Sequence, residues 1–265
     1  MQTEEFQLEI RQNKFNTIQT MFLLDRSSTL IAGPCSIESR EQLEQVADVL
    51  VRHHVPFIRG GAFKPRTSPY SYQGLGAEGL RMLSEVGRQY GLLTISEILD
   101  PRDVQDGAEY LDIIQIGSRN MSNYALLKEV GKSRHPVLLK RGYMSTISEY
   151  LLSAEYIAAA GNTNLILCER GIRSFDNSTR NLLDISGIAL IQKETSLPMI
   201  VDLSHSLGRK DILLPVAKAV LAMGIDGIML EVHPDPGNAL SDQQQQLNLH
   251  ELESFLKAIR WDKDS

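Results

Sequence analysis

The strongest constraint on the fold is an alternation that repeats eight times along the chain. From about residue 28 onwards, short apolar runs rich in β-formers alternate with longer amphipathic stretches. Each run is almost entirely apolar until it reaches a polar residue or a glycine, which is typical of parallel strands buried on both faces. The runs are 29–36, 55–63, 92–98, 113–118, 137–142, 165–171, 199–206 and 227–234.

The intervals between these runs have the pattern of helices. Ser39 and Gln42 have the spacing of a helix-capping pair, and Asp100 precedes Pro101 as an N-cap precedes a first-turn proline. Eight strands alternating with eight helices fit either a closed barrel or a doubly wound sheet. The count favours an α/β fold of the (β/α)8 TIM barrel type, because every strand then has its own helix and no strand lies at an edge.

The domain organisation follows from the same count. A (β/α)8 barrel takes about 250 residues, so one barrel accounts for nearly all of the 265 residues. We therefore predict one catalytic barrel domain over residues 29–265. Residues 1–28 are expected to be a short N-terminal extension, which either covers the N-terminal face of the barrel or forms a frayed arm.

Composition excludes several kinds of partner. The chain has a net charge of −6 at pH 7, so neither nucleic acid nor an anionic membrane is an expected ligand. The first residues lack the basic start and apolar run of a signal peptide, and no run of about 18 apolar residues offers a membrane span. Two cysteines are too few for a disulfide scaffold. These features predict a cytoplasmic protein.

Basic residues gather at the carboxyl ends of the predicted strands, where TIM barrels place their active sites. In an acidic protein, so many cations at one end of a barrel predict anionic ligands, most simply phosphates and a carboxylate. The alternative is that these residues only pair with acidic neighbours, and it is strongest for Arg173. The basic set consists of Arg59, Lys64, Arg66, Arg119, Lys140, Arg170 and Arg173.

A second set of residues has the donor atoms of a metal site. Cys35 follows the first strand, His205 the seventh, and Glu231 and Asp242 come from the end of the eighth and the loop after it. These side chains can meet, because strands 7, 8 and 1 are neighbours in a closed barrel. A thiolate, an imidazole and two carboxylates suit a divalent Mn, Fe, Co or Zn ion better than calcium. Singly, Cys35 fits a core residue and His205 a hydrogen-bonded structural histidine, but the set predicts a metal ion.

The segment from Gly74 to Gly79 matches a dinucleotide-binding pattern of glycines. The glycines of that fingerprint must follow a strand directly, and here several residues intervene. We therefore interpret the segment as the bend that leads into the second helix.

The segments at the strand ends resemble those of one enzyme family. From about residue 25 to residue 260, the chain is similar to 3-deoxy-D-arabino-heptulosonate 7-phosphate (DAHP) synthase of the type I beta class, the first enzyme of the shikimate pathway. As an ordered set the matching motifs are highly specific. In one-letter code they are IAGPCS (31–36), RGGAFKPRTSP (59–69), GSRN (117–120), LKRG (139–142), CERGIR (168–173), EVHPDP (231–236) and ALSD (239–242).

The resemblance implies roles for the site residues. Arg66 and Thr67 would hold the phosphate of erythrose 4-phosphate, and family members are commonly homo-oligomers, so a dimer or tetramer is expected by analogy. The implied ligands of the divalent metal are Cys35, His205, Glu231 and Asp242. The implied phosphoenolpyruvate (PEP) residues are Arg59, Lys64, Arg119, Lys140 and Arg170.

For the condensation itself we hypothesise a division of roles. Polarisation of the acceptor aldehyde is assigned to the metal ion, so that Cys35 and His205 act in catalysis through it. Lys64 is the candidate acid for the developing alkoxide, and Glu97 is the candidate for steering the water that adds to carbon 2 of PEP.

Three other functions remain open on the sequence. 3-Deoxy-D-manno-octulosonate 8-phosphate synthase shares the barrel and PEP but takes arabinose 5-phosphate. Its segment after the strand-2 lysine typically reads Ala-Asn-Arg-Ser-Ser, so Pro65-Arg66-Thr67 favours the four-carbon acceptor. A Schiff-base aldolase acting through Lys140 is the second, and a barrel that only binds a sugar phosphate or a protein is the third.

Two features separate the chain from many relatives. Leu203 stands where the family usually has proline, which changes the backbone near His205 but keeps the histidine. Many relatives also carry a regulatory or chorismate mutase domain, which 28 leading residues cannot build. We therefore expect no strong inhibition of the isolated chain by aromatic amino acids, unless a partner protein supplies the regulatory site.

Overall fold

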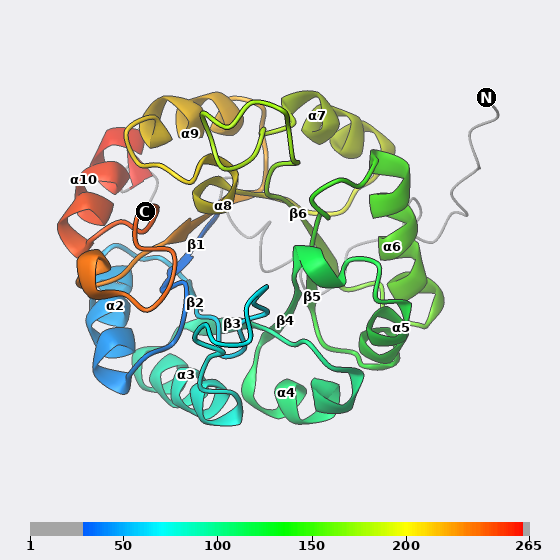
Figure 1. The fold of residues 1–265 in the computed structure, drawn as a ribbon, viewed down its shortest axis with the longest axis horizontal. Coiled ribbons are helices and arrows are strands. Elements are labelled where there is room, and N and C mark those ends of the chain that lie inside the picture. The colour runs from blue at the N-terminus through cyan, green and yellow to red at the C-terminus, as the bar shows by residue number, and fades with distance from the viewer. Residues whose placement is uncertain (1–28, 262–265) are drawn as a thin grey trace.

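The computed structural model describes residues 29–261, and their eight strands close into one parallel barrel. Each strand pairs with its neighbours in the chain, and β8 pairs with β1, so the sheet has no edge. Every predicted run contains one strand, which confirms the (β/α)8 TIM barrel (Figure 1). The strands are β1 (Thr29–Gly33), β2 (Phe57–Arg59), β3 (Leu93–Glu97), β4 (Ile113–Ile116), β5 (Val137–Lys140), β6 (Leu165–Glu169), β7 (Met199–Asp202) and β8 (Gly227–Glu231).

Helices surround the barrel as an outer ring (Figure 1). Ser39 caps α2 by accepting a hydrogen bond from the backbone N–H of Gln42, as its sequence pattern predicts. Gly76 precedes α3 with φ at 61°, so the glycine-rich segment is indeed a bend into a helix. The α-helices are α2 (Arg40–Arg52), α3 (Ala77–Tyr90), α4 (Val104–Tyr110), α5 (Tyr124–Lys132), α6 (Ile147–Ala159), α7 (Ile185–Glu194), α8 (Leu203–Leu207), α9 (Leu213–Leu221) and α10 (Leu249–Ile259). The short 3-10 helices are η1 (Pro101–Asp103), η2 (Ser118–Asn120) and η3 (Pro236–Asn238).

The predicted runs extend beyond the true ends of the strands. After β7 the difference is one of kind, since residues predicted as strand form α8 instead. The reason is local, because Asp202 accepts a hydrogen bond from the backbone N–H of His205 and so starts a helix. This extra helix turns His205 back over the barrel mouth.

The barrel interior is filled rather than open. Its core is a layer of buried apolar side chains, one or two from each strand, and Cys168 is among them. A second and larger apolar layer lies between the strands and the outer helices. The interior residues are Ile31, Phe57, Ile95, Ile113, Leu138, Ile166, Cys168, Ile200 and Met229. Any chemistry must therefore take place above this layer, at one end of the barrel.

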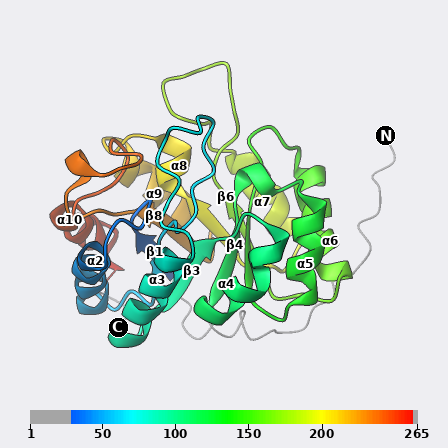
Figure 2. The same cartoon turned by 60° about the horizontal axis from the view of Figure 1, so that its bottom comes forward.

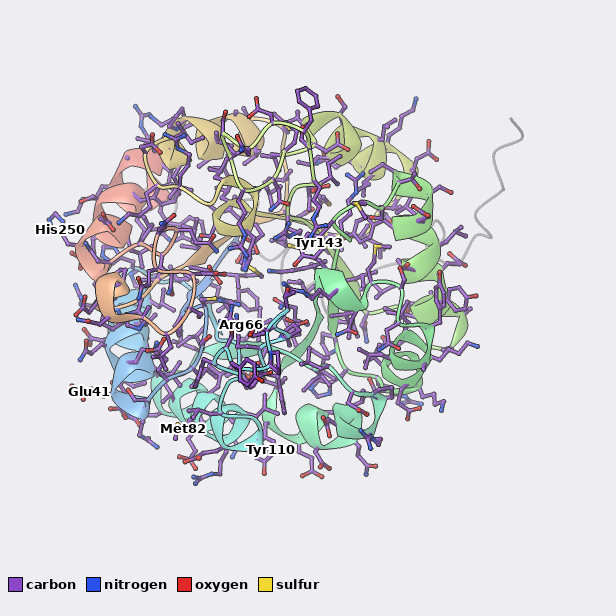
Figure 3. The ribbon with its side chains drawn as sticks, in the orientation of Figure 1. Glu41, Arg66, Met82, Tyr110, Tyr143 and His250 are labelled. Atoms are coloured by element: carbon purple, nitrogen blue, oxygen red, sulfur yellow. The ribbon has the colours of Figure 1, made fainter. Side chains whose placement is uncertain are left out.

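The loops after β2 and β6 rise above the mouth of the barrel (Figure 2). Arg66 and Tyr143 lie toward the centre of the ring, whereas His250 lies on its outer rim (Figure 3). Among residues 29–261, no helix is long and apolar enough to cross a bilayer. The predicted extension over residues 1–28 lies outside the described residues, as do residues 262–265.

Candidate active site

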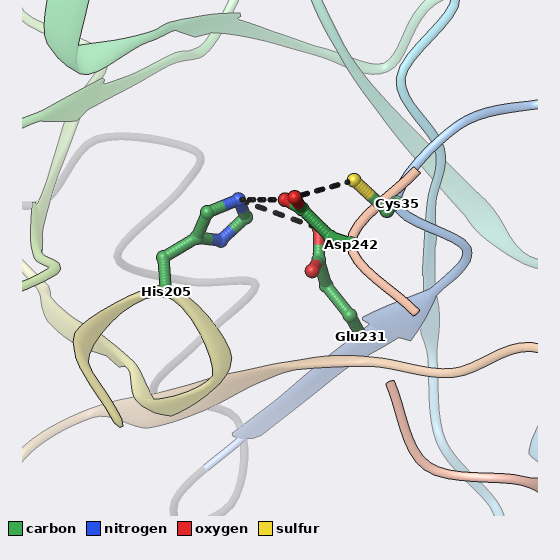
Figure 4. A group of neighbouring side chains, drawn as sticks. All are labelled: Cys35, His205, Glu231 and Asp242. Carbon is green, nitrogen blue, oxygen red and sulfur yellow. Dashed lines mark hydrogen bonds and ion pairs between the residues drawn. The ribbon is translucent and has the colours of Figure 1, made fainter. Parts of the chain in front are cut away.

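Four side chains meet at the mouth of the barrel beside β7, β8 and β1 (Figure 4). One donor atom from each of Cys35, His205, Glu231 and Asp242 lies within 4.8 Å of all the others. Cys35 Sγ donates to Asp242 Oδ2 at 3.4 Å, and His205 Nε2 lies 3.4 Å from Glu231 Oε1. The structure thus brings together the four residues that were predicted as a set.

Close backbone approaches hold this cluster in place. Gly33 has φ at 152°, and a Cβ on it would lie 1.9 Å from the carbonyl oxygen of Arg59, so only glycine lets β1 and β2 come this near. Two residues later, the backbone N–H of Cys35 donates to Gln246 Oε1 at 2.9 Å. Gln246 also donates to the carbonyl of Ser241 at 2.8 Å, which ties the loop of Asp242 to the loop of Cys35.

The chemistry of these donors fits a divalent cation. Burial raises the pKa of the Cys35 thiol to about 12, so a thiolate there needs a strong positive charge beside it. Burial would also raise the pKa of Glu231, but His205, Arg59 and Lys64 together hold it below its usual value. Arg180 and His205 likewise hold the pKa of Asp242 below its usual value. Two carboxylates, a thiol and an imidazole, two of them buried and two partly buried, are together donors that could hold a metal ion.

A pocket walled by cations opens directly beside this cluster. Its lining includes two of the four clustered residues, His205 and Asp242, together with Glu97. The cations that line it are Arg59, Lys64, Arg66, Arg119, Lys140, Arg170 and Arg180. Six of these seven belong to the predicted basic set. The arrangement can bind a small molecule with several negative charges next to a metal ion.

The comparisons with known proteins point in one direction. The chain matches the DAHP synthetase I family over residues 12–265. It is 53% identical, over 88% of its length and 69% of the relative's, to phospho-2-dehydro-3-deoxyheptonate aldolase from Thermotoga maritima. The chain belongs to the DAHP synthetase I family.

Solved structures agree with this assignment. The crystal structure of the Thermotoga maritima enzyme, also named DAHP synthase, superimposes with a TM-score of 0.85 at 52% identity, over 88% of this chain and 68% of that one. Its truncated form gives a TM-score of 0.82 at 48% identity, over 88% and 86% of the two chains. A 2-dehydro-3-deoxyphosphooctonate aldolase from Methylococcus capsulatus is more distant, at 30% identity over 89% of each chain.

In this DAHP synthetase I family protein, cations of the pocket also contact two members of the cluster, Cys35 and Glu231. Lys64 Nζ donates to Cys35 Sγ at 3.0 Å and to the carbonyl of Cys35 at 2.9 Å. Arg59 Nη1 lies 3.1 Å from Glu231 Oε1, and it also donates to the carbonyl of Pro34. The same two cations therefore line the anion pocket and contact the cluster.

Arg180 was missed by the sequence analysis. Its guanidinium donates to Asp242 Oδ2 at 3.0 Å and to Gln245 Oε1 at 2.6 Å, and Gln245 donates to Glu231 Oε2 at 2.5 Å. Arg180 lies in the loop between β6 and α7, far from any strand end, so neither periodicity nor a motif pointed to it.

Tyr143 was missed as well. Its ring lies among three guanidinium groups, those of Arg170 at 4.6 Å, Arg173 at 5.3 Å and Arg119 at 5.6 Å from the ring centroid. Such contacts stabilise a cation over an aromatic face. Arg173 does not line the pocket, so its predicted place in the basic site is not seen here.

Glu97 faces the pocket from the end of β3. Among the described residues, its Oε1 is a buried atom without a hydrogen-bond partner. Burial raises its pKa, although Lys64 and Lys140 act in the opposite direction. Gly117 makes room for it, because a Cβ there would lie 2.0 Å from Glu97 Oε1. This oxygen is able to accept a hydrogen bond on the side of the pocket.

The two residues predicted to bind the phosphate of the sugar occupy different surroundings in the structure. Arg66 lines the pocket and donates to the carbonyl of Tyr72 at 3.2 Å. Thr67 is exposed and is not among the lining residues, so its role stays a prediction.

Proposed function

We propose that the protein condenses PEP with erythrose 4-phosphate to give DAHP and phosphate, the first step of the shikimate pathway towards the aromatic amino acids. The observation that carries this proposal is a cluster of four metal-type donors that adjoins a pocket lined by seven cations. PEP brings a phosphate and a carboxylate, and erythrose 4-phosphate brings a second phosphate. Family membership and 53% identity to the Thermotoga maritima enzyme support the same reaction.

The residues divide into two groups. Cys35, His205, Glu231 and Asp242 would hold a divalent ion, of which Mn, Fe, Co and Zn are all compatible with these donors. When bound, such an ion supplies Lewis acidity toward the acceptor aldehyde. The PEP group consists of Arg59, Lys64, Arg119, Lys140 and Arg170. Arg66, with Thr67, would bind the phosphate of erythrose 4-phosphate.

The chain's own side chains supply the proton steps. Carbon 3 of PEP attacks the aldehyde carbon, and Lys64 Nζ gives a proton to the oxygen that becomes a hydroxyl. Carbon 2 then carries positive charge, and Glu97 orients a water to add there and accepts its proton. Loss of phosphate from carbon 2 leaves the keto group of the product. The surrounding arginines keep both substrates aligned throughout.

The Schiff-base aldolase has less support. Such an enzyme needs a neutral lysine amine as its nucleophile. Lys140 instead lies 2.5 Å from the buried carboxylate of Asp202, in an ion pair. This contact favours a role for Lys140 as a fixed positive charge.

We extend the proposal to the whole protein in three respects. Residues 29–265 would act as one catalytic domain, and the protein would work in the cytoplasm. Copies of the chain would associate as a dimer or tetramer, which exposed apolar side chains on α5, α6 and α7 support, namely Tyr124, Tyr156, Ile185 and Leu190. Sedimentation analysis of purified protein tests the association, and a monomer at all concentrations would refute it.

One experiment tests the central proposal. Purified protein is mixed with PEP and either erythrose 4-phosphate or arabinose 5-phosphate, and phosphate release is followed with and without a chelator. We expect release with the four-carbon sugar only, and its loss with the chelator. Faster release with arabinose 5-phosphate would instead favour the octulosonate enzyme, and no release with either would leave only a binding protein.

A further inference from the structure

Asp202, at the end of β7, is a buried carboxylate that does more than start α8. Its side chain is 0% exposed. A carboxylate in such a place is costly unless hydrogen bonds and opposite charges compensate it. Here the compensation is an ion pair, since Lys140 Nζ lies 2.5 Å from Asp202 Oδ2.

One oxygen of Asp202 accepts from two residues that serve different parts of the site. Oδ2 lies 2.5 Å from Lys140 Nζ, which reaches it from β5, and 2.8 Å from Nδ1 of His205 on α8. The other oxygen, Oδ1, accepts from the backbone N–H of His205 at 2.9 Å. A single carboxylate thus fixes both the ring and the backbone of the histidine.

These contacts determine which ring nitrogen of His205 is available to bind a metal ion. An ionised carboxylate can only accept, so Nδ1 carries the hydrogen and Nε2 presents its lone pair. Nε2 is the nitrogen that faces the cluster, 3.4 Å from Glu231 Oε1 and 3.9 Å from Asp242 Oδ2. A carboxylate behind a metal-ligating histidine orients the ring and strengthens it as a ligand.

The same contacts fix Lys140. Its side chain is 5% exposed and lines the anion pocket, and its ammonium donates to Asp202 Oδ2. The position of this positive charge therefore depends on the residue that also orients His205.

We propose that Asp202 is a positioning residue that holds His205 and Lys140 in one arrangement, so that the metal cluster and the PEP pocket are built as a unit. The inference rests on the proposed function, because it takes His205 as a metal ligand and Lys140 as a PEP ligand. A simpler role is the capping of α8 alone. Asparagine caps a helix about as well as aspartate, so Asp202→Asn separates the two roles.

The first measurement is the affinity of metal-free protein for Co²⁺, followed by the absorption of the cobalt–thiolate bond. Asp202→Asn should raise the dissociation constant of Co²⁺ by about 10- to 100-fold, since the ring of His205 loses its anionic partner. The second is calorimetric titration of metal-free protein with PEP. Its dissociation constant should not rise, because asparagine removes a negative charge beside Lys140, whereas kcat should fall because Lys140 is no longer fixed.

A fall in the affinity for Co²⁺ without a fall in the affinity for PEP is the signature of a positioning role. A loosened structure would weaken the binding of both Co²⁺ and PEP. Asp184→Asn is the matched control, because Asp184 also caps a helix, α7, and also pairs with a cation, Arg141 at 2.8 Å, but lies outside the pocket. It should leave the Co²⁺ affinity unchanged.

Several outcomes would overturn the proposal. They are an unchanged Co²⁺ affinity in folded Asp202→Asn, weaker binding of both ligands, or an equal loss in Asp184→Asn. If Asp202→Asn does not fold, the nitrogen resonances of histidine-labelled, Zn²⁺-loaded wild-type protein decide, and a metal bond at Nδ1 of His205 would refute the proposal. Because neither binding assay needs turnover, the inference and the proposed reaction can fail independently of each other.

Discussion

At the scale of single residues, the two cysteines share burial but not surroundings. Cys35 lies at the mouth among carboxylates and the ammonium of Lys64, whereas Cys168 lies in the apolar interior of the barrel. Burial raises the pKa of both thiols to about 12. The two cysteines therefore differ in the side chains that surround them and not in the pKa of their thiols.

This difference predicts opposite results for one substitution. Cys35→Ala should lower the turnover rate by more than about 100-fold, because a donor of the metal site is lost. The fold should remain intact by circular dichroism. Cys168→Ala, the control, should lower the thermal stability through a small cavity but leave metal binding in place. Near wild-type turnover by Cys35→Ala in metal-depleted buffer would exclude the metal role.

Lys64, the proposed general acid, can be tested by a single substitution. Removal of a general acid typically costs about 10²- to 10⁴-fold in rate, so Lys64→Ala should lower kcat by that amount with little change in Tm. Arg66→Ala serves as a comparison in the same pocket, because it should raise KM for erythrose 4-phosphate and largely spare kcat. If steady-state kinetics show an unchanged kcat for Lys64→Ala, another group donates the proton.

At the scale of elements, the junction of β1 and β2 sets the distance between cluster and pocket. Gly33→Ala would place a Cβ 1.9 Å from the carbonyl oxygen of Arg59. We expect a loss of about 3 kcal/mol or more in the free energy of unfolding, and a fall in activity because Cys35 and Arg59 move apart.

Gly91→Ala is the control for that change. Gly91 also has a positive φ, of 69°, but nothing lies within 4 Å of its Cβ position. Its substitution should cost only about 1–2 kcal/mol of backbone strain and leave activity unchanged. Urea unfolding of both variants measures the two free energies, and equal losses would show that crowding at Gly33 is not the cause.

The strands could be predicted because they are buried on both faces, which leaves an unbroken apolar run in the sequence. Their ends could not, because a hydrogen bond such as that of Asp202 to the backbone of His205 decides where a strand stops. The grouping of Cys35, His205 and Glu231 could be predicted because barrel closure makes β1, β7 and β8 neighbours. The contact of Arg180 with the cluster could not be predicted, because a long loop has no periodicity from which to place its side chains.

At the scale of the whole molecule, the cluster joins the first and last strands of the barrel. Cys35 follows β1, and Glu231 ends β8, the two strands whose pairing closes the sheet. A metal ion there would bind only the folded protein. At a free concentration of about 100 times its dissociation constant, it adds about 2.7 kcal/mol of stability.

The prediction is a rise in Tm of about 5–10 °C when Mn²⁺ is added to metal-free protein, measured by differential scanning calorimetry. Cys168→Ala should show the same rise from a lower starting value, and Cys35→Ala should show little. A rise that survives in Cys35→Ala would mean that Mn²⁺ binds elsewhere.

The long separation of the clustered residues bears on how the protein is made. Cys35 and Asp242 touch across 207 positions of sequence. During synthesis Cys35 therefore leaves the ribosome long before Asp242, its partner in the cluster. Binding of an ion by the four residues would then have to follow the synthesis of Asp242, and products that end before it would offer an incomplete site.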